Sequence, residues 1–109
     1  METLEMNRAS VVANPKIEDT IYVAKFDTGI IGIKVCADGT IDYRSTVAGV
    51  TDDNSSHAST VKVRSGLYIV SWQSVNTTTY ALVLDLENQI AFCSLTLPDK
   101  QVINLAGVI

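Results

Sequence analysis

The strongest constraint on the fold of this chain is a set of three strand-forming runs joined by very short connections. The runs are Leu67 to Ser74, Thr79 to Leu86 and Gln89 to Leu97, and each is rich in β-branched, aromatic and leucine side chains. Parallel strands need a crossover of roughly a dozen residues, and neither connection has that length. The segment therefore predicts a three-stranded antiparallel meander.

One face of this meander carries most of the bulk. Side chains alternate between the two faces of a strand, so every second residue of the first two runs shares this face. Its members are Tyr68, Val70, Trp72, Ser74, Tyr80, Leu82, Leu84 and Leu86. We expect this face to form the interior. The opposite face keeps Ile69, Ala81 and Val83, which suits partial cover by another element or subunit.

Turn signals divide the rest of the chain into further strands. The expected strands are Thr20 to Phe26, Ile30 to Cys36, Thr40 to Val47, Ala58 to Arg64 and Gln101 to Val108. Asp27-Thr28-Gly29 and Ala37-Asp38-Gly39 are expected hairpin turns in which the glycine takes a positive φ.

The polar run from Thr51 to Ser56, followed by His57, predicts the longest loop of the fold. In the strand after this loop, the alternation predicts that Val61 and Val63 point inward. Lys62 and Arg64 are then expected to point outward.

About eight strands with short loops and no long helix predict an all-β fold, a small antiparallel up-and-down barrel whose closure removes exposed edges. A barrel of this size is either filled by side chains or holds one small ligand. The chain of 109 residues is expected to form one domain over residues 17–109, with residues 1–16 as an N-terminal arm or cap.

The charge and the apolar pattern exclude several classes of partner. The net charge of -4 and the scattered basic residues argue against nucleic acid. No apolar run reaches the roughly 18 residues of a membrane span, and the N-terminus lacks a signal-peptide pattern. We therefore expect a soluble, cytoplasmic protein without a membrane partner.

The cysteines, the histidine and the acidic pairs do not form a metal-binding pattern. Cys36 and Cys93 interrupt or follow apolar runs, which indicates small buried hydrophobes over bridged or reactive thiols. His57 and the pair Asp52-Asp53 lack the spacing of zinc or calcium ligands and are expected in a solvated loop. No metal or cofactor is expected.

Two family resemblances agree with the barrel. The runs Asp38 to Arg44, Val47 to Gly49 and Gly66 to Trp72 resemble strands of bacterial phenolic acid decarboxylases, which are small calycin-type, lipocalin-like barrels. Residues 18–109 are more closely similar to the small MoaF-like proteins. That similarity rests on a Tyr-x-Val-Ser-Trp-Gln strand, a strand ending near Asp85, then Pro98-Asp99 and Leu105-Ala106-Gly107.

The catalytic residues of the decarboxylases are absent at the matching positions. The resemblance implies two tyrosines on the first strand, an arginine after Val-Ala-Gly and a glutamate two residues beyond the tryptophan. This chain has Ala24, Phe26, Val50 and Ser74 there. These side chains cannot hold a carboxylate or move a proton, so we predict no phenolic acid decarboxylase activity.

The leading hypothesis is a hollow barrel that binds a small hydrophobic or aromatic molecule in a central cavity. The expected lining is Phe26, Tyr43, Val50, Tyr68, Trp72, Ser74 and Tyr80. The inner aromatics are also compatible with a packed core. Two alternatives stay open: a cofactor-independent isomerase, cyclase or lyase with Tyr43 or Tyr80 as acid or base, and a homodimeric interaction module that uses the opposite face of the meander.

Overall fold

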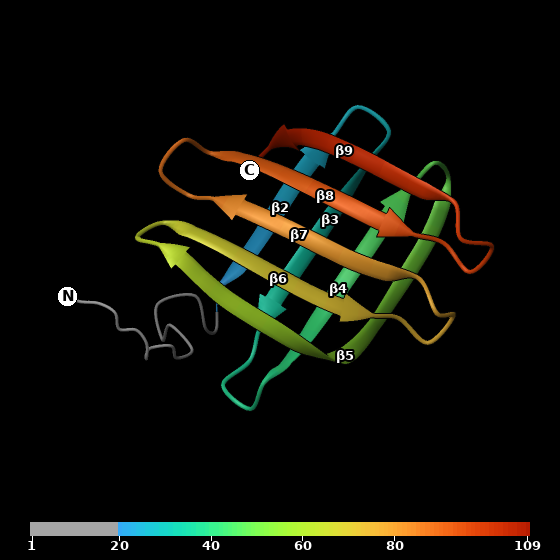
Figure 1. Ribbon diagram of the computed structural model, residues 1–109, viewed down its shortest axis with the longest axis horizontal. Coiled ribbons are helices and arrows are strands. Elements are labelled where there is room, and N and C mark those ends of the chain that lie inside the picture. The colour runs from blue at the N-terminus through green and yellow to red at the C-terminus, as the bar shows by residue number, and fades with distance from the viewer. Residues whose placement is uncertain (1–19) are drawn as a thin grey trace.

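A computed structural model of the protein describes residues 20–109, which form eight strands and no helix (Figure 1). The strands are β2 Ile21–Phe26, β3 Gly29–Val35, β4 Thr40–Val47, β5 Val50–Arg64, β6 Leu67–Gln73, β7 Thr79–Asp85, β8 Ile90–Thr96 and β9 Val102–Val108. Within these residues there is accordingly no helix long and apolar enough to cross a membrane. The expected arm over residues 1–16 lies outside the described residues.

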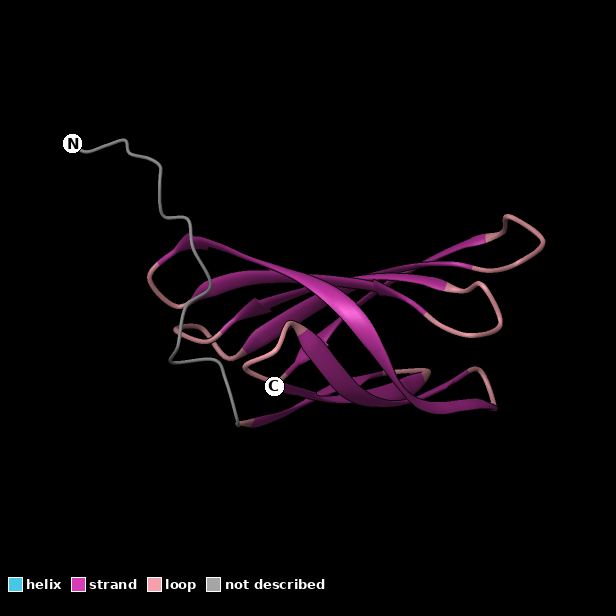
Figure 2. Cartoon of the chain, turned by 90° about the horizontal axis from the view of Figure 1, so that it is seen from below, coloured by secondary structure: helices cyan, strands magenta, loops and turns pink. Residues whose placement is uncertain are grey.

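The strands form a closed antiparallel barrel in sequence order, which confirms the predicted fold. Figures 1 and 2 show it as two crossing layers, with β6 to β9 on one side and β2 to β4 on the other. β5 passes from one layer to the other. Its first half pairs with β4 and its second half pairs with β6.

The barrel closes at a short seam between β2 and β9. The register there includes Lys25 opposite Val108 and Phe26 opposite Gly107. A Cβ atom on Gly107 would lie 2.0 Å from the carbonyl oxygen of Lys25. The absence of a side chain at Gly107 is therefore what lets the last strand approach the first.

Gly29 was expected to supply a positive φ to the first hairpin, and this prediction is wrong. The glycines with positive φ are Gly39, Gly49 and Gly66. Gly29 instead opens β3, where a Cβ atom would lie 2.1 Å from the carbonyl oxygen of Thr46 on β4. Glycine is needed at this position because the backbone of β4 approaches too closely for a side chain.

The predicted loop over Thr51 to Ser56 is also wrong, because these residues and His57 form the first half of β5. They pair with β4 from Val50 opposite Val47 to His57 opposite Thr40. Polar side chains of this half of β5 form hydrogen bonds with neighbouring strands. For example, the Ser56 hydroxyl donates to the carbonyl oxygen of Gln73 on β6 at 2.8 Å. Tertiary pairing thus overrides the low strand propensity of the sequence.

In the second half of β5, the prediction that Val61 and Val63 point inward is wrong, whereas Lys62 and Arg64 are exposed, in line with their predicted outward position. Val61 and Val63 are 50% and 53% exposed. Val61 lies opposite Ile69 on the outer face, whereas Ala58 lies opposite the buried Trp72. Hydropathy alone favoured the valines as inward residues, and the register with β6 decides otherwise.

The middle of the barrel is packed with apolar side chains, and the predicted inner face of the meander is confirmed. The buried hydrophobic residues are Ala24, Ile31, Ile33, Val35, Ile41, Tyr43, Val47, Tyr68, Val70, Trp72, Tyr80, Leu82, Leu84, Ala91, Cys93 and Leu95. The interior of the barrel is therefore an apolar core over most of its length.

Candidate functional site

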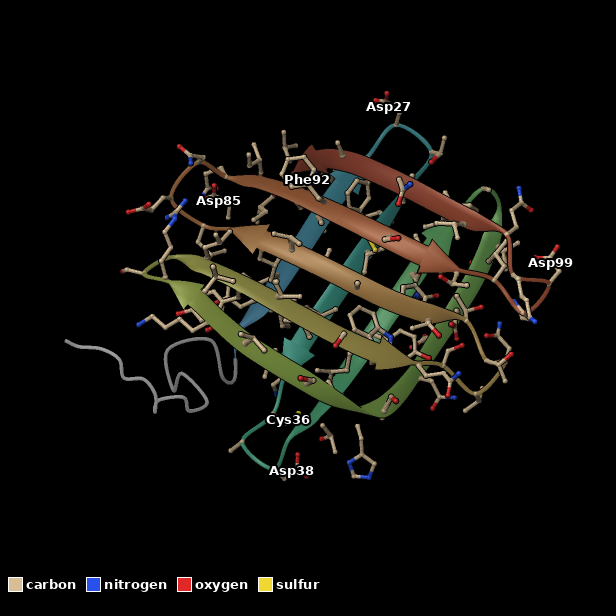
Figure 3. The ribbon with its side chains drawn as sticks, in the orientation of Figure 1. Asp27, Cys36, Asp38, Asp85, Phe92 and Asp99 are labelled. Atoms are coloured by element: carbon tan, nitrogen blue, oxygen red, sulfur yellow. The ribbon has the colours of Figure 1, made fainter. Side chains whose placement is uncertain are left out.

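A cavity of about 390 Å³ occupies the end of the barrel formed by the β4–β5, β6–β7 and β8–β9 turns, which we call the cavity end. These turns lie toward the right of Figure 1, and the labelled Asp99 marks the β8–β9 turn in Figure 3. The cavity is lined by Ser45, Val47, Ala48, Val50, Asp52, Asn76, Thr78, Tyr80, Leu95, Leu97, Pro98, Asp99 and Ile103.

The cavity wall is mostly apolar because the inward positions of β4, β8 and β9 carry aliphatic residues at this end. Val47 and Leu95 are almost fully buried, and Ile103 and Leu97 are half-buried. An apolar wall with a few directed polar groups is the usual composition of a small-molecule site.

Tyr80 is the aromatic residue of the wall, and it belongs to a three-ring cluster. The Trp72 ring stacks on it with centroids 4.7 Å apart and an interplanar angle of 11°. Tyr43 packs against both rings, 5.3 Å from Trp72 and 5.8 Å from Tyr80. The cluster holds the Tyr80 ring in one orientation at the cavity.

Asp52 joins two of these rings through its carboxylate. Its Oδ1 accepts a hydrogen bond from the Tyr43 hydroxyl at 3.3 Å, and its Oδ2 accepts one from the Tyr80 hydroxyl at 2.9 Å. The expectation of a solvated loop residue is therefore wrong for Asp52, which is partly buried and lines the cavity. It faces inward because it lies opposite Ser45, an inward position of β4.

The environment raises the pKa of both tyrosines. Burial is the main cause for Tyr80, with a further contribution from Asp52 and an opposing one from a hydrogen bond with Ser45. Burial and then the charge of Asp52 raise the pKa of Tyr43. Both phenols therefore stay protonated at neutral pH and act as hydrogen-bond donors, and the phenolate form that a general base would need is scarcely populated.

Other polar groups at the cavity end come from the β6–β7 turn. The Asn76 side-chain oxygen accepts hydrogen bonds from the Ser74 hydroxyl and from the backbone N–H of Thr78, the latter at 3.0 Å. Asn76 and the buried Thr78 line the cavity. Ser74 is buried, but it does not line the cavity.

The structure brings some of the sequence-predicted lining residues together and separates others. Val50 and Tyr80 line the cavity, and Tyr43 and Trp72 support it from behind Tyr80. Tyr68 is buried on β6, and Phe26 is half-buried beside the β2–β9 seam; neither lines this cavity.

Sequence reasoning missed the polar half of the site. Asp52, Ser45 and Thr78 line the cavity, and none of them stood out as a candidate lining residue. Ser45 could have been found, because it follows the buried Ile41 and Tyr43 at alternate positions of the predicted strand from Thr40 to Val47. In the ring cluster, the Trp72 Nε1–H is buried without a hydrogen-bond partner among the described residues. Burying such a donor unpaired costs about 1–3 kcal/mol of folding free energy.

The cysteines are free, and Cys93 is a small buried hydrophobe as predicted. Burial raises the pKa of its thiol to about 12. Cys36 is half-buried near the β3–β4 turn. Among residues 20–109, no group of three histidine, cysteine or acidic side chains lies close enough to hold a metal ion.

Comparisons with known proteins agree with this architecture. A solved structure from Burkholderia vietnamiensis, described as a "putative beta-lactamase", superposes with a TM-score of 0.76 at 18% identity, covering 89% of this chain and 96% of that chain. This similarity concerns the fold alone. No curated protein matches the sequence. The model of the MoaF-like family matches residues 20–109, and the chain belongs to the MoaF-like family.

Proposed function

We propose that the protein binds a small hydrophobic or aromatic molecule in the cavity end of the barrel. The observation that carries this proposal is a 390 Å³ cavity whose wall is mostly apolar and includes one ring held by neighbouring rings. Ligand sites commonly occupy about 300–1,000 Å³ and combine apolar walls with a few polar groups. The volume lies at the small end of this range and suits a compact molecule with one or two rings.

Tryptophan fluorescence provides a direct test, because the sequence contains a single tryptophan and its ring stacks on the cavity residue Tyr80. Titration with a panel of neutral aromatic and terpenoid compounds should quench or shift the emission of Trp72 and saturate. Calorimetry on the same compounds should give matching affinities.

A pair of variants on one strand separates cavity binding from surface adsorption. Ile103→Phe enlarges a side chain that lines the cavity, whereas Val102→Phe enlarges its neighbour, which is 53% exposed on the other face. We expect I103F to abolish binding and V102F to bind like the wild type. Binding that survives in I103F, or no saturable binding of any compound, would contradict the proposal.

The protonation of the tyrosines favours binding over the enzymatic alternative. Tyr43 and Tyr80 both donate their hydroxyl protons to Asp52, and their pKa values are raised. A raised pKa makes a phenol a weaker acid, and its base form is scarce at neutral pH, so both tyrosines are poorly suited to acid–base catalysis. An isomerase, cyclase or lyase would need turnover that is lost in Tyr43→Phe or Tyr80→Phe.

A second candidate function, assembly into a homodimer, is favoured by an apolar row on the outer face. Each residue of the row lies opposite the next on the neighbouring strand, across five strands. The row is Val61, Ile69, Val83, Phe92 and Ala106. Phe92 is 46% exposed and is labelled on the near face of Figure 3. A second copy of the chain could cover this row through a two-fold axis.

Sedimentation equilibrium tests the dimer. The wild type should sediment as a dimer and Phe92→Lys as a monomer. Val102→Lys, which changes an exposed apolar residue outside the row, should leave the assembly unchanged. A monomeric wild type would contradict this candidate and would leave the ligand proposal in place.

A further inference from the structure

The charge of the cavity wall is negative, and this limits which apolar molecules it suits. Among residues 20–109, the lining includes the carboxylates of Asp52 and Asp99 and contains no lysine, arginine or histidine. A ligand with a carboxylate would meet like charge and no cation to pair with. The wall therefore disfavours anionic ligands.

Asp52 differs from every other acidic side chain in the described part of the chain. It alone is both shielded from solvent and without a salt bridge to another described residue. Asp85 is more deeply buried, but Arg64 lies 3.8 Å from it. Asp53, the neighbour of Asp52, is exposed and pairs with Arg44 at 3.6 Å.

The carboxylate of Asp52 also has unused capacity for hydrogen bonds. Each oxygen accepts one tyrosine hydroxyl, and a carboxylate offers about four acceptor positions in all. An apolar ligand would displace water from this group and leave its charge uncompensated, which is costly. A ligand that carries its own positive charge removes that cost.

We propose that the cavity prefers a hydrophobic amine, with its ammonium group at the Asp52 carboxylate and its apolar body against Val47, Leu95 and Ile103. This inference rests on the proposed function, since it names the ligand class of the same cavity.

Three probes of similar size but different charge test the preference. We would measure the binding of 2-phenylethylamine, 2-phenylethanol and 3-phenylpropanoate at neutral pH by calorimetry and Trp72 fluorescence. The amine should bind about tenfold or more tightly than the alcohol, because its ammonium group forms an ion pair with the Asp52 carboxylate, whereas the alcohol offers an uncharged donor. The carboxylate should bind most weakly of the three.

Two matched variants locate the effect. Asp52→Asn keeps the shape of the side chain and removes its charge, so it should bring the affinities for amine and alcohol close together. Asp53→Asn removes a charge from the exposed neighbour and should keep the wild-type preference.

The outcomes distinguish this inference from the function it rests on. If the alcohol binds and the amine binds no better, or if D52N keeps the preference, the inference is overturned and the ligand proposal stands. If no probe binds, both fail. The comparison of three probes on the wild type decides the matter even if D52N does not fold.

Discussion

The two ends of the barrel surround a shielded aspartate in opposite ways. At the end opposite the cavity, Asp85 accepts hydrogen bonds from the backbone and side-chain N–H groups of Asn88, and Arg64 lies nearby. At the cavity end, the Asp52 carboxylate accepts two tyrosine hydroxyls as its only hydrogen-bond donors in the described part of the chain, and it faces a cavity. Figure 3 shows Asp85 and Asp99 at opposite ends. A fully partnered carboxylate shapes a turn, whereas a partly partnered one is available to a ligand.

The turns differ between the ends as well. Away from the cavity, the β3–β4 and β5–β6 turns place Gly39 and Gly66 at positive φ. At the cavity end, Ala48, Thr77 and Lys100 take positive φ values, which cost an L-residue more than they cost glycine. At the opposite end only Gln89, in the β7–β8 turn, is a described non-glycine residue with positive φ. The cavity end therefore carries more of this backbone strain than the opposite end.

The largest expected difference between packed and hollow regions is in stability. Leu82 is 1% exposed in the packed middle, whereas Leu97 is half-buried at the cavity. Leu82→Ala should lower the free energy of unfolding by about 2–5 kcal/mol. Leu97→Ala should lower it by about 1 kcal/mol, because less apolar area is lost. Chemical denaturation measures both, and equal losses would contradict the assignment of a packed middle and a hollow end.

A smaller effect is expected at alkaline pH. The raised pKa of Tyr80 means that the folded protein keeps a proton that the unfolded chain releases near pH 10. Stability should therefore fall as the pH rises above about 10, by up to about 1.4 kcal/mol per pH unit for this group. Tyr80→Phe should show a shallower fall over the same range. Identical slopes of unfolding free energy against pH in the two proteins would contradict the buried position of this hydroxyl.

At acid pH, the stability that Asp85 contributes at the end opposite the cavity should be lost. Hydrogen bonds from Asn88 are the main cause that lowers the pKa of Asp85, with Arg64 contributing. The unfolded chain then binds a proton before the folded one, so the stabilisation is present above about pH 4 and is lost as the pH falls below it. Asp85→Asn should lose less stability between pH 5 and pH 3 than the wild type does. Urea midpoints at the two pH values measure this, and equal losses would exclude Asp85 as a contributor.

The packed half of the molecule could be predicted from the sequence, because burial on one face imposes alternation. Tyr68, Val70 and Trp72 on β6 occupy inward positions, and so do the alternate residues of β7. The same alternation gave the strands on both sides of each turn and hence the barrel. Where a strand packs against a core, the hydropathy of alternate residues indicates which face of the strand points inward.

The first half of β5 could not be predicted, because its inward side faces a cavity and polar neighbours. Asp52 faces the cavity next to a serine, so no apolar period marks this part of the strand. Without an apolar period, the sequence does not indicate that the Asp52 carboxylate accepts hydrogen bonds from Tyr43 and Tyr80. Tyr43 and Trp72 were correctly predicted to point inward. Whether they line the cavity or lie behind Tyr80 depends on how the three rings pack, which the alternation of residues does not indicate.

The smallest expected effect concerns the strained turn at the cavity. Ala48 and Gly49 take φ values of 52° and 80° between the paired residues Val47 and Val50, a two-residue hairpin that favours Asn-Gly. Ala48→Asn should therefore raise the free energy of unfolding by about 0.5–1 kcal/mol. Ala37→Asn, in the β3–β4 turn at the other end, is the matched control, because Ala37 is not among the residues with positive φ. A gain in A48N alone would place the strain at the cavity, whereas equal gains in both variants would mean that asparagine stabilises any turn of this barrel and that the two ends do not differ.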